Sequence, residues 1–251
     1  MEGCCQIVGG AQGRAHIVCV VSVAWNAHPR WTLIVAGNRD EFHARAAAPL
    51  GPWADAPGII AGRDLLSQGT WMGVSDMGRF GVVTNVRNPQ GPDPDKASRG
   101  ALVTNWLTMS HLPEALDAFN PFNLLLADQT AIHFLSNRPS DHRARLGDGI
   151  HGLSNAVSDS VWPRKDRLNH ALQSWLSHSA DEPTELFGPL SDCSVEGADG
   201  HPLFIRHPVY GTRCSTILAV AKAGAGQIIE RRFDKDGHCT GESAHDFRWP
   251  V

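Results

Sequence analysis

Several features that would assign this sequence to a familiar class of protein are missing from it. Among its 251 residues, no apolar run reaches the roughly 18 residues that a membrane-crossing helix needs. Lysine and arginine number 22 against 26 aspartates and glutamates, a formal net charge of -4, so the chain lacks the basic excess of a nucleic-acid-binding protein. These absences predict neither stable membrane insertion nor a nucleic-acid partner.

Paired cysteines are also missing. The six cysteines, at positions 4, 5, 19, 193, 214 and 239, contain no CxxC motif and no regular spacing. In a chain of this length, that pattern is typical of reduced thiols in a cytoplasmic protein rather than of a disulfide framework. The apolar run 17–25 is a poor secretory signal, because Arg14 is the single basic residue before it and Glu2 opposes it.

The common cofactor and metal signatures do not occur. There is no GxxxxGK[ST] sequence, no GxGxxG between a strand and a helix, no HExxH, and no Cys/His spacing that would bind zinc. Ser154 lies in a Gly-Leu-Ser-Asn-Ala segment that resembles a nucleophile elbow, but the residues after it do not open a helix. We therefore expect no resident cofactor, no metal and no serine nucleophile.

The chain instead shows short apolar runs separated by turn residues, with 42% hydrophobic and 19% charged residues. The alternation of these runs predicts strands, and the helical spacing of others predicts helices. We expect strands over 59–64, 69–75, 79–85, 122–128, 131–136 and 149–155, helices over 98–110, from 113 and over 163–177, and a final hairpin of 212–222 with 227–234. No linker or change in composition divides the chain, which indicates one α+β domain with antiparallel sheets and outer helices.

The most informative pattern is Cys19 followed by the tetrad Asn38-Arg39-Asp40-Glu41. Cys19 lies in the run 17–25, a turn spans 26–30, and a second run, 31–36, has the tetrad at its end. A hairpin of this kind brings the tetrad beside the thiol. A thiol next to a guanidinium and a carboxylate is typical of an activated nucleophile. The alternative is a buried strand cysteine and a solvated polar turn.

Three more polar residues follow apolar runs: Asn85, Asn155 and Arg213. Each of them alone fits a turn or a cap. Together with the tetrad, they could supply an oxyanion hole and a charge clamp around one thiol, which is what acyl transfer requires.

A longer series of motifs runs in order from Val18 to about Phe233. It comprises Cys19 six residues before Trp25, Ala27-His28-Pro29, Asn38-Arg39-Asp40-Glu41-Phe42, Gly62-Arg63-Asp64, Gly69-Thr70-Trp71-Met72-Gly73, Val83-Thr84-Asn85-Val86-Arg87, Ser98-Arg99-Gly100, Phe122-Asn123-Leu124-Leu125, Gly152-Leu153-Ser154-Asn155, Trp162-Pro163 and Tyr210-Gly211-Thr212-Arg213-Cys214-Ser215-Thr216. In combination these motifs resemble the NRDE family, also called the Transport and Golgi organisation protein 2 family.

The resemblance implies the fold of the N-terminal nucleophile hydrolases, a four-layer αββα sandwich. In that family the cysteine normally follows the initiator methionine, whereas Val18 occupies that position here. We therefore expect residues 1–17 to be a non-native or cleaved extension and residues 18–251 to form the single family domain.

The resemblance also implies roles for individual residues. Cys19 is the expected nucleophile, with its own α-amine as base. Arg39 is expected to lower the pKa of the thiol, and Asp40 to hold the α-amine. The remaining candidates are Asn85 and Asn155 for the oxyanion region and Arg213 as a support for the cysteine.

Two functions are compatible with the resemblance. The first is a cytoplasmic hydrolase or acyltransferase that acts on a small amide or thioester through Cys19. The alternative is a non-enzymatic haem-trafficking or lipid-handling protein, with haem as a transported ligand. The residues themselves do not identify the substrate or the oligomeric state.

Overall fold

The computed structural model describes residues 19–86, 88, 90–109, 111–154, 162–178, 180–195 and 202–251. Its strands pair antiparallel in two sheets. The first sheet has the order β10-β1-β2-β11-β12-β13 and the second has the order β3 to β9. The first sheet is made of β1 (Val20–Trp25), β2 (Trp31–Phe42), β10 (Gly149–Leu153), β11 (Tyr210–Ala221), β12 (Ala225–Phe233) and β13 (Cys239–Arg248).

The second sheet continues through consecutive strands of the chain. It is made of β3 (Ala47–Pro52), β4 (Ile59–Asp64), β5 (Met72–Ser75), β6 (Arg79–Asn85), β7 (Phe122–Ala127), β8 (Ile132–Ser136) and β9 (His142–Leu146). The helical segments are α1 (Gly100–Met109), α2 (Pro163–His178), α3 (Phe187–Leu190) and the 3₁₀ turns η1 (Leu116–Ala118) and η2 (Pro183–Leu186).

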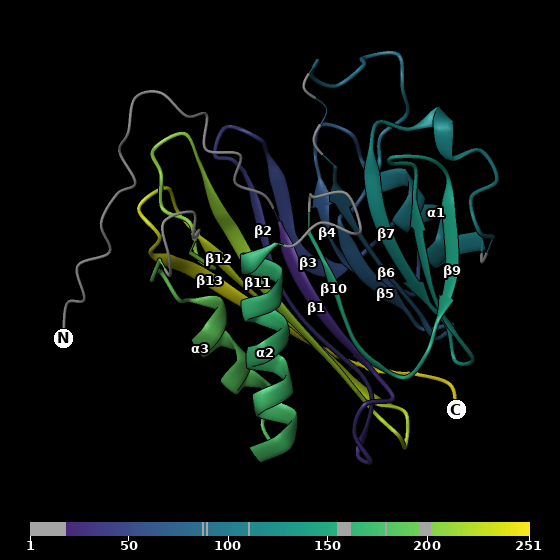
Figure 1. The fold of residues 1–251 in the computed structure, drawn as a ribbon, viewed down its shortest axis with the longest axis vertical. Helices are drawn as coiled ribbons and strands as arrows, with labels where there is room; N and C mark the ends of the chain where they lie inside the picture. Colours follow the sequence, from purple (N-terminus) through teal and green to yellow (C-terminus); the bar gives the residue numbers. More distant parts are fainter. Residues whose placement is uncertain are drawn as a thin grey trace.

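The two sheets pack face to face, with α1 on the outer side of one sheet and α2 and α3 on the outer side of the other (Figure 1). This arrangement is a four-layer αββα sandwich, as the family resemblance implied. The helix expected after Pro113 is only the 3₁₀ turn η1. None of the helices in the described part of the chain has the length and apolar character that a bilayer crossing needs.

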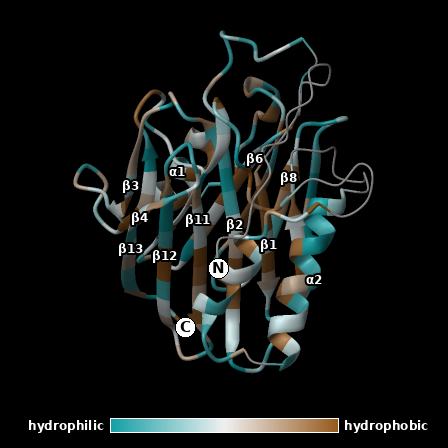
Figure 2. Cartoon of the chain, turned by 90° about the vertical axis from the view of Figure 1, so that its left-hand side faces the viewer, coloured by the Kyte–Doolittle hydropathy of each residue, from teal (hydrophilic) through white to brown (hydrophobic). Residues whose placement is uncertain are grey.

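Three apolar clusters hold the layers together, because each strand places alternate side chains on opposite faces of its sheet. One cluster fills the space between the sheets, a second lies between the first sheet and α2, and a third lies between the second sheet and α1. The predicted apolar face of α2, formed by Leu168, Leu172, Trp175 and Leu176, is buried in the second cluster. Hydrophobic residues accordingly recur along the strands, whereas α2 also presents hydrophilic ones (Figure 2).

The start of α1 lies against the loop between β4 and β5. A side-chain carbon on Gly69 would come within 2.6 Å of the Gly100 carbonyl carbon, and one on Gly100 within 3.1 Å of the Thr70 backbone. Glycine is therefore required at Gly69, because any larger residue would collide with backbone that cannot rotate away. This contact explains why Gly69-Thr70 and Arg99-Gly100 both belong to the motif series.

The structure corrects several details of the sequence prediction. The tetrad does not form a turn, because β2 continues through it to Phe42. Strands β3, β9 and β13 were not expected, so the hairpin of β11 and β12 is not the last element. Cys19, Cys214 and Cys239 have free thiols, but Cys193 is disulfide-bonded, contrary to the expectation of reduced cysteines throughout.

Candidate active site

The tetrad presents two different faces because it is part of a strand. From Leu33 to Ala36 in β2, the even-numbered residues pack towards α2 and the odd-numbered ones pack between the sheets. Continued through the tetrad, this alternation places Asn38 and Asp40 towards the helices and Arg39 and Glu41 towards the second sheet. The two pairs therefore have separate surroundings.

Asn38 is fully buried and its amide is bonded on both sides. Its Nδ2 donates to the carbonyl oxygens of Leu190 and Leu203, at 2.9 and 2.8 Å. Its Oδ1 accepts a hydrogen bond from Ser215 Oγ at 2.6 Å. Asn38 therefore ties the segments that follow α2 to the first sheet.

Asp40 forms a buried ion pair with Arg164. Its Oδ2 lies 2.7 Å from Arg164 Nη2, and both side chains are at most 2% exposed. Asp40 Oδ1 accepts a hydrogen bond from Thr212 Oγ1 at 2.6 Å. Burial raises the pKa of the Asp40 carboxyl, while Arg164 and Thr212 act in the opposite direction. The predicted role of Asp40, holding the α-amine of Cys19, remains a prediction.

Sequence reasoning did not identify Arg164. It is the second residue of α2, directly after the Trp162-Pro163 motif. A positive charge in the first turn of a helix is unfavourable because the helix dipole is positive there. That mismatch is the signal in the sequence, and the buried carboxylate of Asp40 compensates it in the structure.

Cys19 lies directly before β1. The pairing of β1 with β2 begins with Val20 opposite Asn38, so the next position places Cys19 beside Arg39. On the other side of β2, the register pairs Cys214 with Arg39. Arg39 thus has a cysteine beside it on each of the two neighbouring strands. The predicted proximity of Cys19 to Arg39 is found.

The surroundings of the Cys19 thiol stabilise its protonated form. Sγ lies 3.6 Å from the Asp40 carbonyl oxygen. Burial, followed by the negative charge of Asp40, raises the pKa of Cys19 to about 12, although Arg39 acts to lower it. Arg39 therefore has the expected direction of effect but does not determine the net pKa, so the thiol requires a base to react near neutral pH.

Arg39 itself has few partners. It is 9% exposed, and its Nη2 lies 3.7 Å from Glu41 Oε2. No hydrogen bond of the guanidinium occurs among the described residues. Arg39 therefore contrasts with Asp40, whose carboxylate is held by short contacts.

Arg213 supports the turn after β2, and its predicted support of Cys19 remains a prediction. The register of β11 shifts between Thr212 and Cys214, which makes Arg213 a bulge residue. Its Nη1 donates to the carbonyl oxygens that follow β2, those of Phe42, His43 and Arg45, at 3.1, 2.8 and 3.2 Å. Arg213 thus fixes the chain after the tetrad and also lines the cavity described next.

A cavity of about 450 Å³ opens where one end of the first sheet faces one end of the second. Cys19, Arg39, Glu41 and Arg213 line it, together with Asn85, which is exposed at the end of β6. Of the six predicted site residues, the cavity thus brings together Cys19, Arg39, Asp40, Asn85 and Arg213. Asn155 lies outside the described residues.

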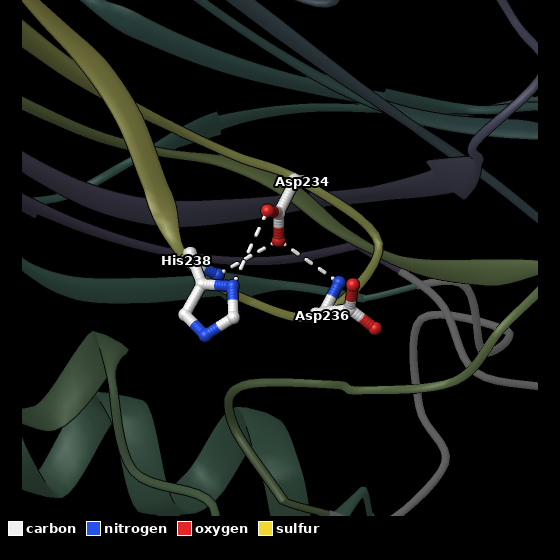
Figure 3. A group of neighbouring side chains, drawn as sticks. All are labelled: Asp234, Asp236 and His238. Carbon is white, nitrogen blue, oxygen red and sulfur yellow. Dashed lines mark hydrogen bonds and ion pairs between the residues drawn. The ribbon is translucent and has the colours of Figure 1, made fainter.

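A separate group of titratable side chains lies in the loop between β12 and β13 (Figure 3). Asp234 Oδ1 accepts hydrogen bonds from the backbone N–H groups of Asp236 and His238, both at 2.9 Å. Asp234 Oδ2 lies 3.3 Å from His238 Nδ1. The carboxylate therefore has a structural role in closing the loop.

Comparison with known proteins identifies relatives along almost the whole chain. Residues 18–235 match the family described as Transport and Golgi organisation 2. The chain is 28% identical over 262 residues to the Transport and Golgi organization protein 2 homolog of Homo sapiens, covering 87% of this chain and 95% of that protein. The Mus musculus homolog is 27% identical over the same coverage.

Among solved structures, the chain is similar to a Caenorhabditis elegans N-acylethanolamine-hydrolyzing acid amidase ortholog. The TM-score is 0.53 at 15% sequence identity, and the match covers 80% of this chain and 92% of the amidase. At this level of identity the likeness concerns the fold, and it agrees with the four-layer sandwich.

Proposed function

The chain belongs to the Transport and Golgi organisation 2 family, and from this premise we propose that it is a cysteine hydrolase or acyltransferase acting on a small amide or thioester. The observation that carries the proposal is the Cys19 thiol lying beside Arg39 in the wall of the cavity. The likeness of the fold to that of an amidase supports the same reaction class.

The raised pKa of Cys19 determines what the reaction needs. With a pKa of about 12, the thiol is almost entirely protonated near neutral pH. Arg39 alone does not offset burial and the charge of Asp40, so a base must take the thiol proton. In a form of the protein that begins at Cys19, the free α-amine of the same residue is within reach of the thiol and serves as that base.

The reaction then has two balanced halves. Cys19 Sγ attacks the carbonyl carbon while its proton passes to the α-amine. The bond from that carbon to the leaving amine or thiol breaks, and the leaving group takes the proton. Water next attacks the thioester that Cys19 has formed, which releases the carboxylic acid and restores the thiol. Attack by another amine or thiol in place of water gives acyl transfer.

Arg39 and Asn85 line the cavity in which the reacting carbonyl would bind. A side-chain amide can donate hydrogen bonds to the oxyanion of a tetrahedral intermediate. We assign Asn85 to oxyanion stabilisation. Arg213 contributes by fixing the turn after β2.

The test compares two forms of the protein. One is the full chain, and the other has a methionine start placed directly before Cys19 so that its removal exposes the cysteine. After a screen of amides and thioesters, Cys19→Ser in the second form should lower turnover by about a thousandfold or more, because the hydroxyl is a far weaker nucleophile. Intact mass spectrometry should detect an acyl adduct on Cys19 during turnover.

Cys239→Ser is the matched control, because Cys239 is a free and exposed cysteine outside the cavity. It should leave turnover unchanged. Full activity in Cys19→Ser would remove the nucleophile from the proposal. Haem or lipid binding that survives Cys19→Ser, with no acyl chemistry in either form, would instead favour the carrier function. The cytoplasmic location also remains a proposal, to be checked by fractionation of cells that produce the native protein.

A further inference from the structure

The cavity beside Cys19 is more positive than the chain as a whole. The chain has a formal net charge of -4. The cavity is nevertheless lined by seven arginines and lysines and only five aspartates and glutamates. Two positive charges are therefore left over inside a concave site, where solvent screens them less than on an open surface.

Several of these cations have carboxylate partners. Arg45 lies 2.6 Å from Asp64, and Arg63 lies 2.7 Å from Asp55. Such pairs hold the rim of the cavity together and have little capacity left for a ligand.

Arg39 is the first cation that lacks a close partner. It is nine-tenths buried and lines the cavity, yet its nearest carboxylate oxygen, on Glu41, is 3.7 Å away. A guanidinium carries five N–H donors, and none of those of Arg39 makes a hydrogen bond within the described residues. Keeping such a group desolvated is costly unless a ligand completes its bonding.

Arg99 is the second cation of the cavity without a close carboxylate partner. Its Nη1 donates to the Pro121 carbonyl oxygen at 3.2 Å, and the described residues provide no carboxylate within ion-pairing distance of it. Burial, together with repulsion from Arg45, lowers the pKa of Arg99, whereas Glu41 raises it. A bound anion would relieve this unfavourable position.

Arg99 also stands directly before α1, which begins at Gly100. The first turn of a helix carries partial positive charge and N–H groups without partners in the helix. Gly100 lines the cavity next to Arg99, so the helix end adds to the positive field there. The close contact of Gly100 with Gly69 holds this helix end against the loop between β4 and β5.

We propose that Arg39 and Arg99 together form a subsite for an anionic oxygen group, a carboxylate or a phosphate, on the ligand of this cavity. Both arginines line the same cavity as Cys19. A ligand that places its carbonyl at Cys19 and an anionic group at these arginines carries both groups within the one cavity, as an N-acylated amino acid does. This substrate class rests on the proposed function, but the anion subsite itself can be measured without any reaction.

The experiment measures the affinity of three unreactive probes for the full chain carrying Cys19→Ala. The probes are an N-acylglycine, the matching neutral N-acylglycinamide and the matching N-acylaminomethylphosphonate, each with the same acyl chain, measured by isothermal titration calorimetry. We expect the carboxylate or the phosphonate to bind about tenfold tighter than the neutral amide, as a charge-assisted hydrogen bond implies. The tighter of the two anions assigns the group as carboxylate or phosphate.

Arg99→Gln should remove most of this preference, and Arg99→Lys should retain part of it because the charge remains. Arg145→Gln is the matched control, since Arg145 also makes one bond to a backbone carbonyl, that of Thr130, but does not line the cavity. Equal affinity for the neutral amide and both anions, or no binding of either anion at millimolar concentration, would overturn the proposal. So would a preference that survives Arg99→Gln in a variant with an unchanged melting temperature.

The outcome is separable from that of the proposed function. An anion preference that depends on Arg99, without hydrolysis in the form beginning at Cys19, would leave the subsite standing and remove the hydrolase. Hydrolysis of neutral amides with no preference for anionic ones would do the reverse.

Discussion

The two faces of β2 differ sharply within the four residues of the tetrad. On the face towards the helices, the Asn38 amide has three hydrogen bonds, and Asp40 has a short ion pair and a hydroxyl donor. On the face towards the second sheet, the described residues offer Arg39 only the Glu41 carboxylate, at 3.7 Å. On the first face the polar side chains have their hydrogen-bond partners within the protein, as in a protein core. On the second face the Arg39 guanidinium retains donors with which it can bind a ligand.

The difference separates two reasons for placing charged and polar residues in a strand. Asn38 and Asp40 hold the outer helical layer on the first sheet, so their replacement should affect stability. Arg39 faces the cavity and the thiol, so its replacement should affect chemistry and binding. The following predictions test this division.

The largest effect on stability is expected from Asp40→Asn. The substitution removes the negative charge of Asp40 that faces the buried guanidinium of Arg164, which should lower the free energy of unfolding by about 3–5 kcal/mol. Urea unfolding followed by circular dichroism measures the change. Arg39→Gln is the control on the opposite face and should change stability by less than about 1 kcal/mol. Similar losses in the two variants would contradict the division.

A smaller effect is expected from Asn38→Ala. The carbonyl oxygens of Leu190 and Leu203 and the hydroxyl of Ser215 would all lose their partner on Asn38. We expect a loss of about 2–3 kcal/mol, because buried polar groups without partners are costly. Urea unfolding of the double variant Asn38→Ala with Ser215→Ala should show a loss smaller than the sum of the two single losses. Strict additivity would indicate that the amide and the hydroxyl do not act together.

The smallest and most specific effect concerns the thiol in the full chain. Because the pKa of Cys19 is about 12, its alkylation by iodoacetamide should rise about tenfold per pH unit from neutral pH upward, without the plateau that an ordinary thiol shows above its pKa of about 8.5. Since Arg39 acts to lower this pKa, Arg39→Gln should slow the labelling further at each pH. Peptide mass spectrometry follows Cys19 separately from the exposed Cys239. A plateau below pH 9 would contradict the buried, protonated thiol.

The form that begins at Cys19 sharpens the same comparison. There the α-ammonium adds a positive charge beside the thiol, so labelling near neutral pH should be faster than in the full chain. Equal labelling rates in the two forms would show that the α-amine does not act on the thiol.

The sequence predicted the central strands and the edge strand β10, but it failed at the other three edges of the two sheets. Hairpins such as β5–β6 have alternating apolar residues and a glycine turn, so their sequence pattern predicts them. The three unexpected strands, β3, β9 and β13, are all edge strands. β3 contains two prolines and β13 buries no residue fully, so neither carries the apolar alternation of a central strand.

The site was predicted in part for a similar reason. The neighbourhood of Cys19 and Arg39 follows from a hairpin, which is a local structure. The partner of Asp40 does not, because Arg164 is more than a hundred residues away and reaches Asp40 only after α2 packs on the first sheet. The net pKa of Cys19 also depends on burial, which motif spacing does not reveal.

The contact between Gly69 and Gly100 has a consequence for how wide the cavity can be. No side chain separates the two backbones, so the start of α1 is in direct backbone contact with the loop between β4 and β5. Every other amino acid at Gly69 acts as a spacer that pushes the Arg99 end of α1 outward. The width of the cavity beside Arg99 therefore depends on the absence of a side chain at Gly69, which itself lines the cavity.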